Sequence, residues 1–398
     1  MRSNKLVYTS LTLLLTVTPA GTRTSAQNQP ATAPKPAIQQ LASLEFPWGM
    51  AYLPDGRLLI TEKPGRLRIY DGKALSAPIG NLPVISYREG KSEQGGLLDV
   101  AVDPEFAKNR FIYLSYAEEV TSSAAPPKAD DDPRFGGNLD LSDNRLRRGV
   151  VTRGRLDGDR LSAVQVLWRQ EPTTVARGHF GNRLVFGRDN TLFITSGDRM
   201  RFDPAQDPSS NLGKVVRINR DGTIPKDNPF VGKAGTRPEI WSLGHRNMLA
   251  AAVNPASGQL WVFEMGPLGG DELNIIQPGK NYGWPLVSDG SNYDKSDIPD
   301  HATRSEFEKP VRTWTPVISP SGALFYDGSL FPWRDHIIVG GLSARGLIVL
   351  PVTGNTVGAE QRIDIGRRVR DVIQAGDGSL LVITDEKSGA LLKLSPAS

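Results

Sequence analysis

The chain has 398 residues, a formal net charge of +4 and no cysteine. Hydrophobic residues make up 38% of it and charged residues 23%, which is the composition of a globular protein with a sizeable core. The lack of cysteine excludes disulfides, thiolate metal sites and cysteine nucleophiles. Basic residues are scattered among acidic ones, so nucleic-acid binding is disfavoured.

Residues 1–26 have the pattern of a secretory signal peptide. Arg2 and Lys5 precede an apolar stretch over residues 6–20, and small residues at 24–26 offer a cleavage site. The apolar stretch is short and rich in threonine, so a cleaved signal is favoured over a retained membrane anchor. We therefore expect an exported protein that does not insert stably in a membrane. Export without disulfides favours a bacterial periplasm.

Residues 27–40 are rich in Pro, Gln and Ala and are expected to form a linker before a folded part at 41–398. In the folded part, a turn of Asp, Asn, Gly or Pro followed by a short apolar strand recurs six times. The copies lie at residues 53–62, 103–115, 188–196, 254–264, 326–331 and 376–385. Such repeats are typical of a propeller, in which each blade is a four-stranded sheet. The sequence therefore predicts an all-β, six-bladed β-propeller, with a β-sandwich as the alternative.

The widest gap between copies contains residues 118–147, a polar, Pro-rich segment that we expect to be a loop at the mouth of a site. No long amphipathic helical pattern occurs, which disfavours an α/β fold. Five tryptophans are expected in the core or between blades rather than against a ligand: Trp48, Trp241, Trp261, Trp284 and Trp314.

The four histidines of the chain narrow the search for a general base that works near neutral pH. His179 lies between glycines just before an expected blade strand, and Asp198 ends the next strand. Adjacent antiparallel strands would place the Asp198 carboxylate beside the imidazole, where it would fix the tautomer and stabilise the imidazolium. The alternative is that both side chains only satisfy hydrogen bonds of turns.

Arginines at two places are candidates for a channel lining. Arg246, between His245 and Asn247, could bind an anion or polarise a carbonyl, or it could clamp strand ends; His245 is expected to be structural. Arg368 and Arg370 would face the same side of a strand. Adjacent guanidinium groups repel unless an anion such as a ligand carboxylate lies between them. A solvated basic surface is the alternative for this pair.

Oxygen ligands for a hard cation are offered by Gly266, Pro267, Asp271 and Glu272, because Ca²⁺ accepts backbone carbonyls together with carboxylates. The spacing is not that of an EF-hand, so the pattern alone is a weak indication. The chain also has no Walker loop, no G-x-S-x-G elbow, no H-E-x-x-H motif and no dinucleotide-binding fingerprint.

Short segments in a fixed order carry a further pattern. They are Phe46-Pro-Trp-Gly-Met50, Glu93-Gln-Gly-Gly-Leu-Leu98, Gly178-His-Phe-Gly-Asn-Arg183, Asn211-Leu-Gly-Lys-Val-Val-Arg217, Gly244-His-Arg-Asn247, Glu264-Met-Gly-Pro267, Gly270-Asp-Glu-Leu-Asn274, Asn281-Tyr-Gly-Trp-Pro285 and Arg368-Val-Arg-Asp-Val372. From about Leu41 to Leu394 this pattern resembles the soluble quinoprotein sugar dehydrogenases. These are the aldose and glucose dehydrogenases that depend on pyrroloquinoline quinone (PQQ), with the related sorbosone dehydrogenases.

The resemblance implies a six-bladed propeller that holds PQQ, a planar tricarboxylate, and oxidises an aldose at its anomeric carbon to the lactone. It implies that His179 takes the proton of the anomeric hydroxyl while hydride passes to the quinone. Asp198 would orient His179, and Arg246 would stabilise negative charge on the quinone. Further cofactor contacts are implied for Gln94, Asn247, Arg368 and Arg370.

For calcium, the resemblance implies that the carbonyls of Gly266 and Pro267 bind a Ca²⁺ that bridges to PQQ, with a second Ca²⁺ near Glu272 and Tyr282. One departure concerns a cofactor-binding lysine that the glucose-specific members carry before an Arg-Gly pair, where this chain has Ala344. A missing charge-assisted contact costs about 1.5–3 kcal/mol unless a neighbour such as Arg345 replaces it.

Two other functions are open: a calcium-dependent sugar lactonase and a non-catalytic binding propeller. A lactonase needs a channel site rich in carboxylates, whereas this chain offers arginines. His179, Asp198, Arg246 and Arg370 disfavour a non-catalytic protein, and Ala344 weakly favours one. For the dehydrogenase we expect an aldose substrate, a quinone or dye as electron acceptor, and a monomer or homodimer.

Overall fold

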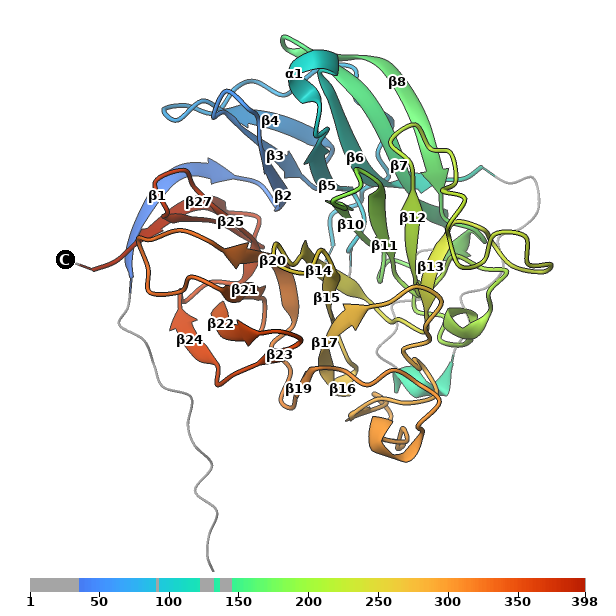
Figure 1. Ribbon diagram of the computed structural model, residues 1–398. Coiled ribbons are helices and arrows are strands. Elements are labelled where there is room, and N and C mark those ends of the chain that lie inside the picture. Colours follow the sequence, from blue (N-terminus) through green and yellow to red (C-terminus); the bar gives the residue numbers. More distant parts are fainter. Residues whose placement is uncertain (1–35, 91–92, 122–131, 137–144, 398) are drawn as a thin grey trace, which may run out of the picture.

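The computed structural model describes residues 36–90, 93–121, 132–136 and 145–397. Its strands form six antiparallel sheets that follow one another around a common axis in chain order, so the predicted six-bladed propeller is confirmed (Figure 1). Within the described residues, α1 (Phe106–Asn109) is the one α-helix. No helix among them is long and apolar enough to cross a membrane.

Each blade is named here by its order in the chain, and its strands are given from the axis outward. Blades 1 to 3 are β2 (Pro47–Tyr52), β3 (Leu58–Glu62) and β4 (Arg66–Tyr70); β5 (Leu97–Val102), β6 (Phe111–Glu119), β7 (Leu146–Asp157) and β8 (Arg160–Arg169); and β10 (Gly181–Phe186), β11 (Leu192–Ser196), β12 (Lys214–Ile218) and β13 (Ile240–Leu243). Blades 4 and 5 are β14 (Met248–Val253), β15 (Leu260–Glu264), β17 (Asp271–Ile276) and β19 (Arg312–Trp314); and β20 (Pro320–Tyr326), β21 (His336–Gly341), β22 (Gly346–Thr353) and β24 (Gln361–Asp364). Blade 6 is β25 (Val369–Gln374), β26 (Leu380–Thr384), β27 (Gly389–Ser395) and β1 (Ala37–Leu44). Short strands β9 (Thr174–Val175), β16 (Leu268–Gly269), β18 (Gly290–Ser291) and β23 (Thr356–Val357) lie outside these series.

The ring is closed by the two ends of the chain. The N-terminal strand β1 pairs antiparallel with β27, with Ala37 opposite Ser395 and Leu44 opposite Gly389, and forms the outer strand of the last blade. The boundary expected at Leu41 is therefore wrong, because β1 begins at Ala37 within the expected linker. An outer strand exposes most of its side chains, so the polar start of β1 gives no apolar pattern.

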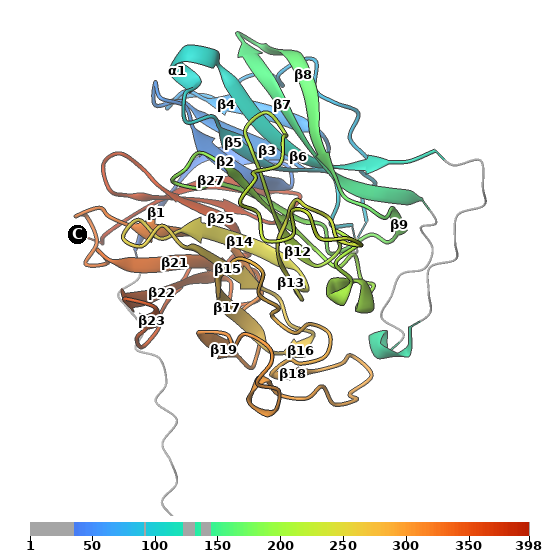
Figure 2. The same cartoon turned by 45° about the vertical axis from the view of Figure 1, so that its right-hand side comes forward.

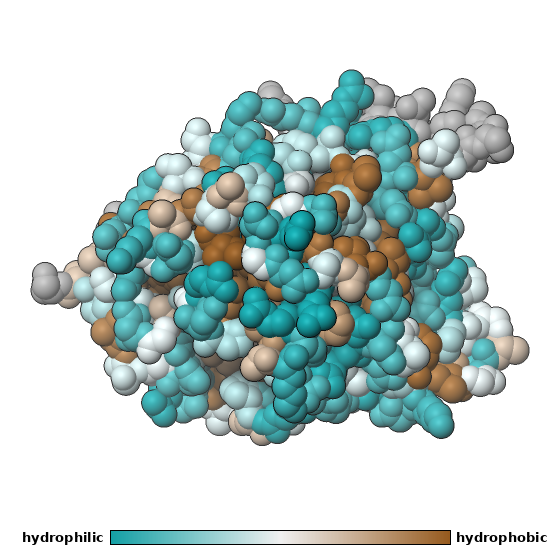
Figure 3. All heavy atoms as spheres, turned by 90° about the horizontal axis from the view of Figure 1, so that it is seen from above, coloured by the Kyte–Doolittle hydropathy of each residue, from teal (hydrophilic) through white to brown (hydrophobic). Residues whose placement is uncertain are grey.

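Six apolar clusters of the core lie one between each pair of neighbouring blades, including the pair formed by blades 6 and 1. Two smaller clusters lie around Phe180 and around Phe202. Second strands such as β3, β11, β15 and β26 are buried along their whole length because neighbouring blades cover both faces. This explains why they read as continuous apolar runs rather than as alternating patterns. Hydrophilic residues cover most of the face shown in Figure 3.

Five of the six sequence repeats coincide with the second strand of a blade, but the repeat at 326–331 does not. Tyr326 ends β20, and β21 begins only at His336. The Phe331 and Trp333 rings stack at 4.3 Å in the turn between these strands and belong to the cluster between blades 5 and 6. The apolar residues that suggested a strand there are buried in a turn instead.

The expected loop at 118–147 begins and ends inside strands, since β6 runs to Glu119 and β7 starts at Leu146. Residues 122–131 and 137–144 lie outside the described part. The described piece is a short 3₁₀ turn, Pro133–Phe135, which lies near the loops around β16 and β18 in both views (Figures 1 and 2). Phe135 packs against Phe202 with their ring centroids 4.8 Å apart.

Every inner strand has an irregular register near its start, where the chain approaches the axis. The shifts lie between Pro47 and Met50, Leu97 and Val100, Gly181 and Leu184, Met248 and Ala250, Ser321 and Ala323, and Val369 and Asp371. A bulge redirects side chains relative to a regular strand. The shifted segments contain residues with side chains at the axis: Trp48, Arg183, Leu249 and Arg370.

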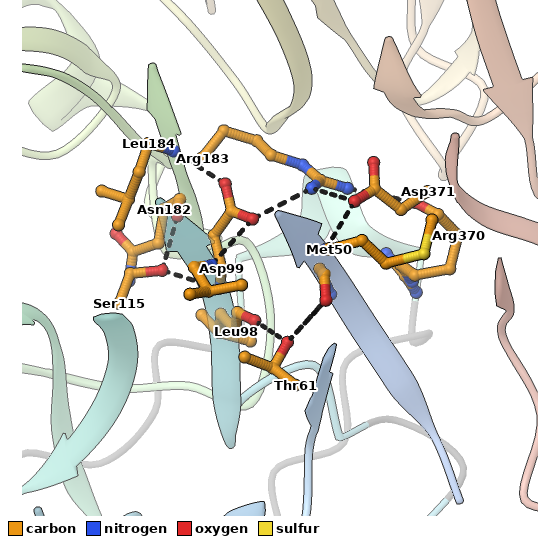
Figure 4. A network of polar contacts seen from close by, with 12 residues as sticks. Met50, Thr61, Leu98, Asp99, Ser115, Asn182, Arg183, Leu184, Arg370 and Asp371 are labelled. Carbon is orange, nitrogen blue, oxygen red and sulfur yellow. Dashed lines mark hydrogen bonds and ion pairs between the residues drawn. The ribbon is translucent and has the colours of Figure 1, made fainter. Parts of the chain in front are cut away.

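An ion-pair network joins three inner strands at the axis (Figure 4). Nη1 of Arg183 lies 3.3 Å from both Asp99 Oδ1 and Asp371 Oδ2, and the guanidinium also donates to the carbonyls of Leu249 and Arg370. All three charged side chains are buried. Because Arg183 comes from blade 3, Asp99 from blade 2 and Asp371 from blade 6, the network ties together blades on different sides of the axis.

Candidate active site

A cavity of about 750 Å³ lies where the inner strands begin. Part of its lining is apolar and consists of Trp48, Phe180, Leu249 and Met265, which pack on one another. A second part is charged and comes from blades 1 and 6 and the loop before β5. Its residues are Lys63, Glu89, Glu93, Arg368, Arg370, Asp385 and Lys387. An apolar surface beside a charged one suits a flat ligand that carries charges at its edge.

Two of the lining carboxylates are neutralised by the protein itself. Both carboxylate oxygens of Glu93 accept hydrogen bonds from Nη1 of Arg147 at 2.9 Å, and this pair is buried. Glu89 forms an ion pair with Lys387, with Nζ 2.7 Å from Oε1. These four residues leave no net charge in the cavity.

The remaining charges are unequal in sign. Asp385 Oδ1 lies 2.8 Å from Arg370, and Asp385 Oδ2 lies 3.1 Å from Arg368. Burial raises the pKa of Asp385, but the charges of Arg370 and Lys63 outweigh it and hold this pKa far below its usual range. Asp385 thus forms ion pairs with Arg368 and Arg370 and interacts at longer range with the charge of Lys63. One negative charge faces three positive charges, so the cavity carries an excess of positive charge.

The arrangement corrects one step of the sequence argument. Arg368 and Arg370 do face the same cavity, as predicted, but the anion between them is Asp385 rather than a ligand. The pair is also not a solvated surface, because the Arg370 side chain is only 9% exposed, although that of Arg368 is 43% exposed. Their contact with a ligand stays a prediction.

His179 and Asp198 are brought together as predicted. Nδ1 of His179 lies 2.6 Å from Oδ1 of Asp198, and Oδ2 of Asp198 accepts a hydrogen bond from Nε1 of Trp284 at 2.8 Å. Nε2 of His179 makes no hydrogen bond within the described residues and is not among their buried unpartnered atoms. Asp198 thus orients the ring, while Nε2 stays available.

Protonation of this pair is set by burial and by charge. Burial lowers the pKa of His179, and Arg246 lowers it further, although Asp198 opposes the change. Burial raises the pKa of Asp198, but His179 and Arg246 lower it to a net value below the usual one. Near neutral pH the carboxylate is therefore ionised and the imidazole is neutral, with its proton on Nδ1 and a lone pair on Nε2. A base needs this state.

The backbone around His179 is held in a strained conformation. His179 has φ of 52°, and its N–H donates to Oε1 of Gln94 at 2.9 Å. The buried guanidinium of Arg199 donates to the carbonyls of Gly178, Ala176 and Arg147 and stacks on Phe180 at 3.6 Å. Left-handed backbone at a non-glycine residue persists only where its surroundings enforce it. Arg199 and Gln94 supply that enforcement.

Arg246 lies beside the pair but is oriented by strand ends. Its Nη1 donates to the carbonyls of Met265 and Gly266, each at 3.0 Å, and its guanidinium carbon lies 5.2 Å from the Trp284 ring. Among the described residues, neither its buried Nε nor the buried Oδ1 of Asn247 has a hydrogen-bond partner. Arg246 thus clamps strand ends, as one of its two sequence interpretations expected, and its binding of an anion or carbonyl stays a prediction. Met265, whose carbonyl it binds, lines the cavity.

The candidate calcium ligands are engaged in internal contacts. The Gly266 carbonyl accepts from Arg246, and Pro267 beside it is buried. Glu272 lies 2.9 Å from Nε2 of His301, and the Tyr282 hydroxyl donates to the Ile275 carbonyl at 2.6 Å. No group of three or more His, Asp or Glu side chains within the described residues is arranged to hold a metal ion.

His245 is structural, as expected. It is fully buried, its Nδ1 lies 2.9 Å from Glu264, its Nε2 lies 2.9 Å from Ser242, and its ring stacks on Tyr282. Glu264 also accepts the Arg246 N–H at 2.7 Å. This cluster fixes the strand end that carries Arg246.

Sequence reasoning missed several residues of the site, among them Asp385. Trp48 lines the cavity and Trp284 binds Asp198, although both were expected only in the core or between blades. Lys63 follows a repeat strand and was not singled out, because a lone lysine after a strand gives no signal in a single sequence. The Gly-Trp-Pro turn around Trp284 was the one available hint.

Comparison with known proteins decides the family. The model of the Glucose / Sorbosone dehydrogenase family matches residues 44–393. The chain belongs to this family. Among its relatives, aldose sugar dehydrogenase YliI of Escherichia coli (strain K12) is 41% identical over 378 residues, which cover 92% of this chain and 94% of that protein.

Two further comparisons concern proteins whose descriptions mention a quinone cofactor. Quinoprotein glucose dehydrogenase B of Acinetobacter calcoaceticus is 27% identical over 434 residues, covering 89% of this chain and 86% of that protein. The PQQ-bound form of an aldose sugar dehydrogenase from Streptomyces coelicolor matches with a TM-score of 0.69 and 27% identity, covering 92% of this chain and 99% of that one.

Ala344, which stands where the glucose-specific members of this family are expected to carry a lysine, lies outside the cavity lining. It packs against the apolar cluster between blades 4 and 5. Arg345 does not replace a missing lysine, because it is exposed to solvent in part and donates to the Gly366 carbonyl.

Proposed function

We propose that the protein oxidises aldose sugars at the anomeric carbon to lactones, with PQQ as the electron acceptor and calcium as a cofactor. The observation that carries this proposal is the excess of positive charge in a partly apolar cavity beside an oriented, neutral imidazole. A planar tricarboxylate has the shape and charge for this lining. Membership in a family of sugar dehydrogenases supports the same reading.

The residues present fit the cofactor. Trp48, Phe180, Leu249 and Met265 offer apolar contact to a flat ring, and Arg368 and Arg370 offer cations for carboxylates. Nε of Arg246 and Oδ1 of Asn247 are buried and have no hydrogen-bond partner within the described residues, so polar groups of a cofactor could bind them. When bound, PQQ supplies a quinone that accepts two electrons.

The geometry supports a proposed role for each of three residues. Nε2 of His179 accepts the proton of the anomeric hydroxyl, because its lone pair is free and burial keeps the ring neutral. Asp198 holds the ring and stabilises the imidazolium that forms, which makes it a positioning residue. Arg246 is held in place by the Met265 carbonyl, so its positive charge is fixed. This charge would stabilise negative charge that develops on a carbonyl oxygen of the quinone.

Calcium is proposed to bind together with the cofactor. The carbonyls of Gly266 and Pro267 are oxygen donors of the kind that Ca²⁺ prefers. The Gly266 carbonyl already accepts from Arg246, and the nearby carboxyl groups are engaged elsewhere. We therefore expect the protein alone to hold Ca²⁺ weakly, with the anionic cofactor supplying the remaining ligands. The second calcium position near Glu272 and Tyr282 is proposed on the resemblance alone.

Export to the periplasm is also proposed. It rests on the signal pattern at residues 1–26, which lie outside the described residues. The mass of the protein recovered from a bacterial periplasmic fraction tests it, with loss of these residues expected. The full-length mass in a membrane fraction would contradict it.

One experiment tests the function. The mature protein is freed of cofactors, PQQ and CaCl₂ are added together or singly, and dye reduction is followed with a panel of aldoses. Turnover that requires both additions supports the proposal. Hydrolysis of a sugar lactone without PQQ, or no turnover with any sugar, would contradict it.

A further inference from the structure

Lys63 is placed against the cavity by a rigid backbone. It follows β3, its N–H donates to the Phe46 carbonyl at 2.9 Å, and its own carbonyl accepts from Leu97 at 3.0 Å. Gly96 packs on it so closely that a Cβ there would collide with the Lys63 carbonyl. The chain has thus fixed this lysine between the starts of blades 1 and 2, and its side chain lines the cavity.

The Lys63 ammonium is poorly partnered for a buried cation. The residue is 8% exposed, and its single hydrogen bond within the described residues goes to the Glu93 carbonyl at 3.3 Å. Nζ also lies 5.1 Å from the Phe46 ring centroid. An ammonium has three N–H donors, and a buried donor without a hydrogen bond costs free energy. Burial accordingly lowers the pKa of Lys63.

The surroundings of Lys63 call for a further anion. The nearest charges that act on it are Asp385, Arg370, Glu93 and Arg368. The Glu93 carboxylate is already bound by Arg147, and Asp385 is divided between the two arginines. Lys63 makes no ion pair with any carboxylate within the described residues. An anionic ligand in the cavity would satisfy its free donors.

We propose that Lys63 is a direct contact for an anionic group of the cofactor, acting from blade 1 beside the Arg368 and Arg370 pair of the neighbouring blade 6. The proposal rests on the proposed function, since it assigns this lysine to the ligand of that cavity. Lys63 then contributes binding energy rather than stability of the empty protein. In the empty protein its ammonium is desolvated with one long hydrogen bond, whereas in the complex it has a charged acceptor.

The test measures PQQ binding to the cofactor-free protein by calorimetry at fixed CaCl₂ concentration, together with the melting temperature of each empty protein. The variants are Lys63→Met, Lys63→Arg and the control Lys280→Met. Lys280 does not line the cavity, is paired with Glu308 and is 50% exposed. We expect Lys63→Met to weaken binding about 10- to 100-fold, which corresponds to the loss of one charge-assisted hydrogen bond. Lys63→Arg should retain most of the affinity, and Lys280→Met should change it by less than about threefold.

Two readouts separate a ligand contact from a structural role. The empty Lys63→Met protein should melt no lower than the parent, because it loses a buried charge whose one hydrogen bond is long. The pKa of Lys63 is lowered from 10.5, so its ammonium should lose its proton at an alkaline pH below that value. The affinity of the parent for PQQ should fall over the same pH range. The Lys63→Arg variant should not show this fall, because arginine stays charged. Binding by Lys63→Met within twofold of the parent overturns the proposal. A lower melting temperature combined with no rescue by arginine also overturns it. If the parent itself binds no PQQ, the proposed function fails, and this assignment fails with it.

Discussion

Asp198 fixes His179 through a hydrogen bond of 2.6 Å to Nδ1, while its second oxygen is held at 2.8 Å by Nε1 of Trp284. The carboxylate therefore cannot turn away from the imidazole without losing the indole. This leaves Nε2 as the one ring nitrogen that can act on a substrate. The relationship makes separate predictions for the base and for the residue that orients it.

Replacing His179 by Gln removes the base while keeping a polar side chain of similar length. We expect turnover of the PQQ- and calcium-loaded enzyme to fall by about 10² or more, as for loss of a general base. PQQ affinity should stay close to that of the parent, because His179 is not among the residues that line the cavity. Steady-state kinetics and calorimetry measure the two effects. Full activity would show that another group removes the proton.

Replacing Asp198 by Asn tests the orientation. The carboxylate raises the pKa of His179, so its loss should lower that pKa further below 6.5. Activity depends on the neutral base, and the acid limb of the kcat/KM profile should therefore move to lower pH in the variant. The plateau should also fall by about 10² or more, since an amide does not select the productive tautomer. A plateau equal to that of the parent would contradict the assigned role.

Arg183 should contribute strongly to stability. Its replacement by Met leaves Asp99 and Asp371 buried without their shared cation, which costs about 3–5 kcal/mol in the free energy of unfolding. Burial raises the pKa of Asp99 to about 6 and also raises that of Asp371. A carboxyl group with a raised pKa weakens the fold as pH rises through that value. The deficit should therefore shrink when urea unfolding is repeated at pH 5, and an unchanged deficit would contradict this account.

Asp385→Asn removes the carboxylate that Arg368 and Arg370 share. The pKa of Asp385 is depressed, so its stabilising contribution is present above 3.8 and is lost only as pH falls through the lower folded value. At pH 7 the empty variant should melt below the parent, because three cations are then left without a carboxylate. Bound PQQ should raise its melting temperature by more than it raises that of the parent. Equal shifts in both proteins would mean that the ligand does not meet these cations.

Calcium should bind with the cofactor rather than before it. With the Gly266 carbonyl engaged by Arg246, and with no preformed cluster of carboxylates within the described residues, CaCl₂ alone should leave the melting temperature nearly unchanged. CaCl₂ with PQQ should raise it further than PQQ alone. The control is MgCl₂, which prefers a small octahedral site and should add less. A large rise in melting temperature with calcium alone would contradict the proposal that calcium binds together with PQQ.

The fold could be predicted because its determinants are local. The turn and apolar strand of each blade recur in the sequence, and burial from both sides makes second strands such as β15 and β26 continuous apolar runs. The start of β1 at Ala37 could not be predicted, since an outer strand needs no apolar alternation. The strand expected at 326–331 was wrong because an apolar residue need not lie in a strand to be buried. Phe331 is buried in the turn between β20 and β21.

The site was predictable only where a residue type is scarce or its setting is unusual. His179 stood out among few histidines, and its flanking glycines suggested an accessible turn. The partner of Arg368 and Arg370 did not stand out, because Asp385 follows a strand of ordinary pattern, β26, and meets the arginines only through the pairing of β25 with β26. Lys63 joins the cavity through contacts with Phe46 and Leu97, which no single-sequence pattern reveals.

The most direct test of the account is the structure of the protein in complex with PQQ and Ca²⁺. We predict the quinone within the cavity of about 750 Å³, with its carboxylates toward Lys63, Arg368 and Arg370 and its reactive edge toward Nε2 of His179. An empty cavity at saturating PQQ, or a quinone bound away from His179, would contradict the proposed function.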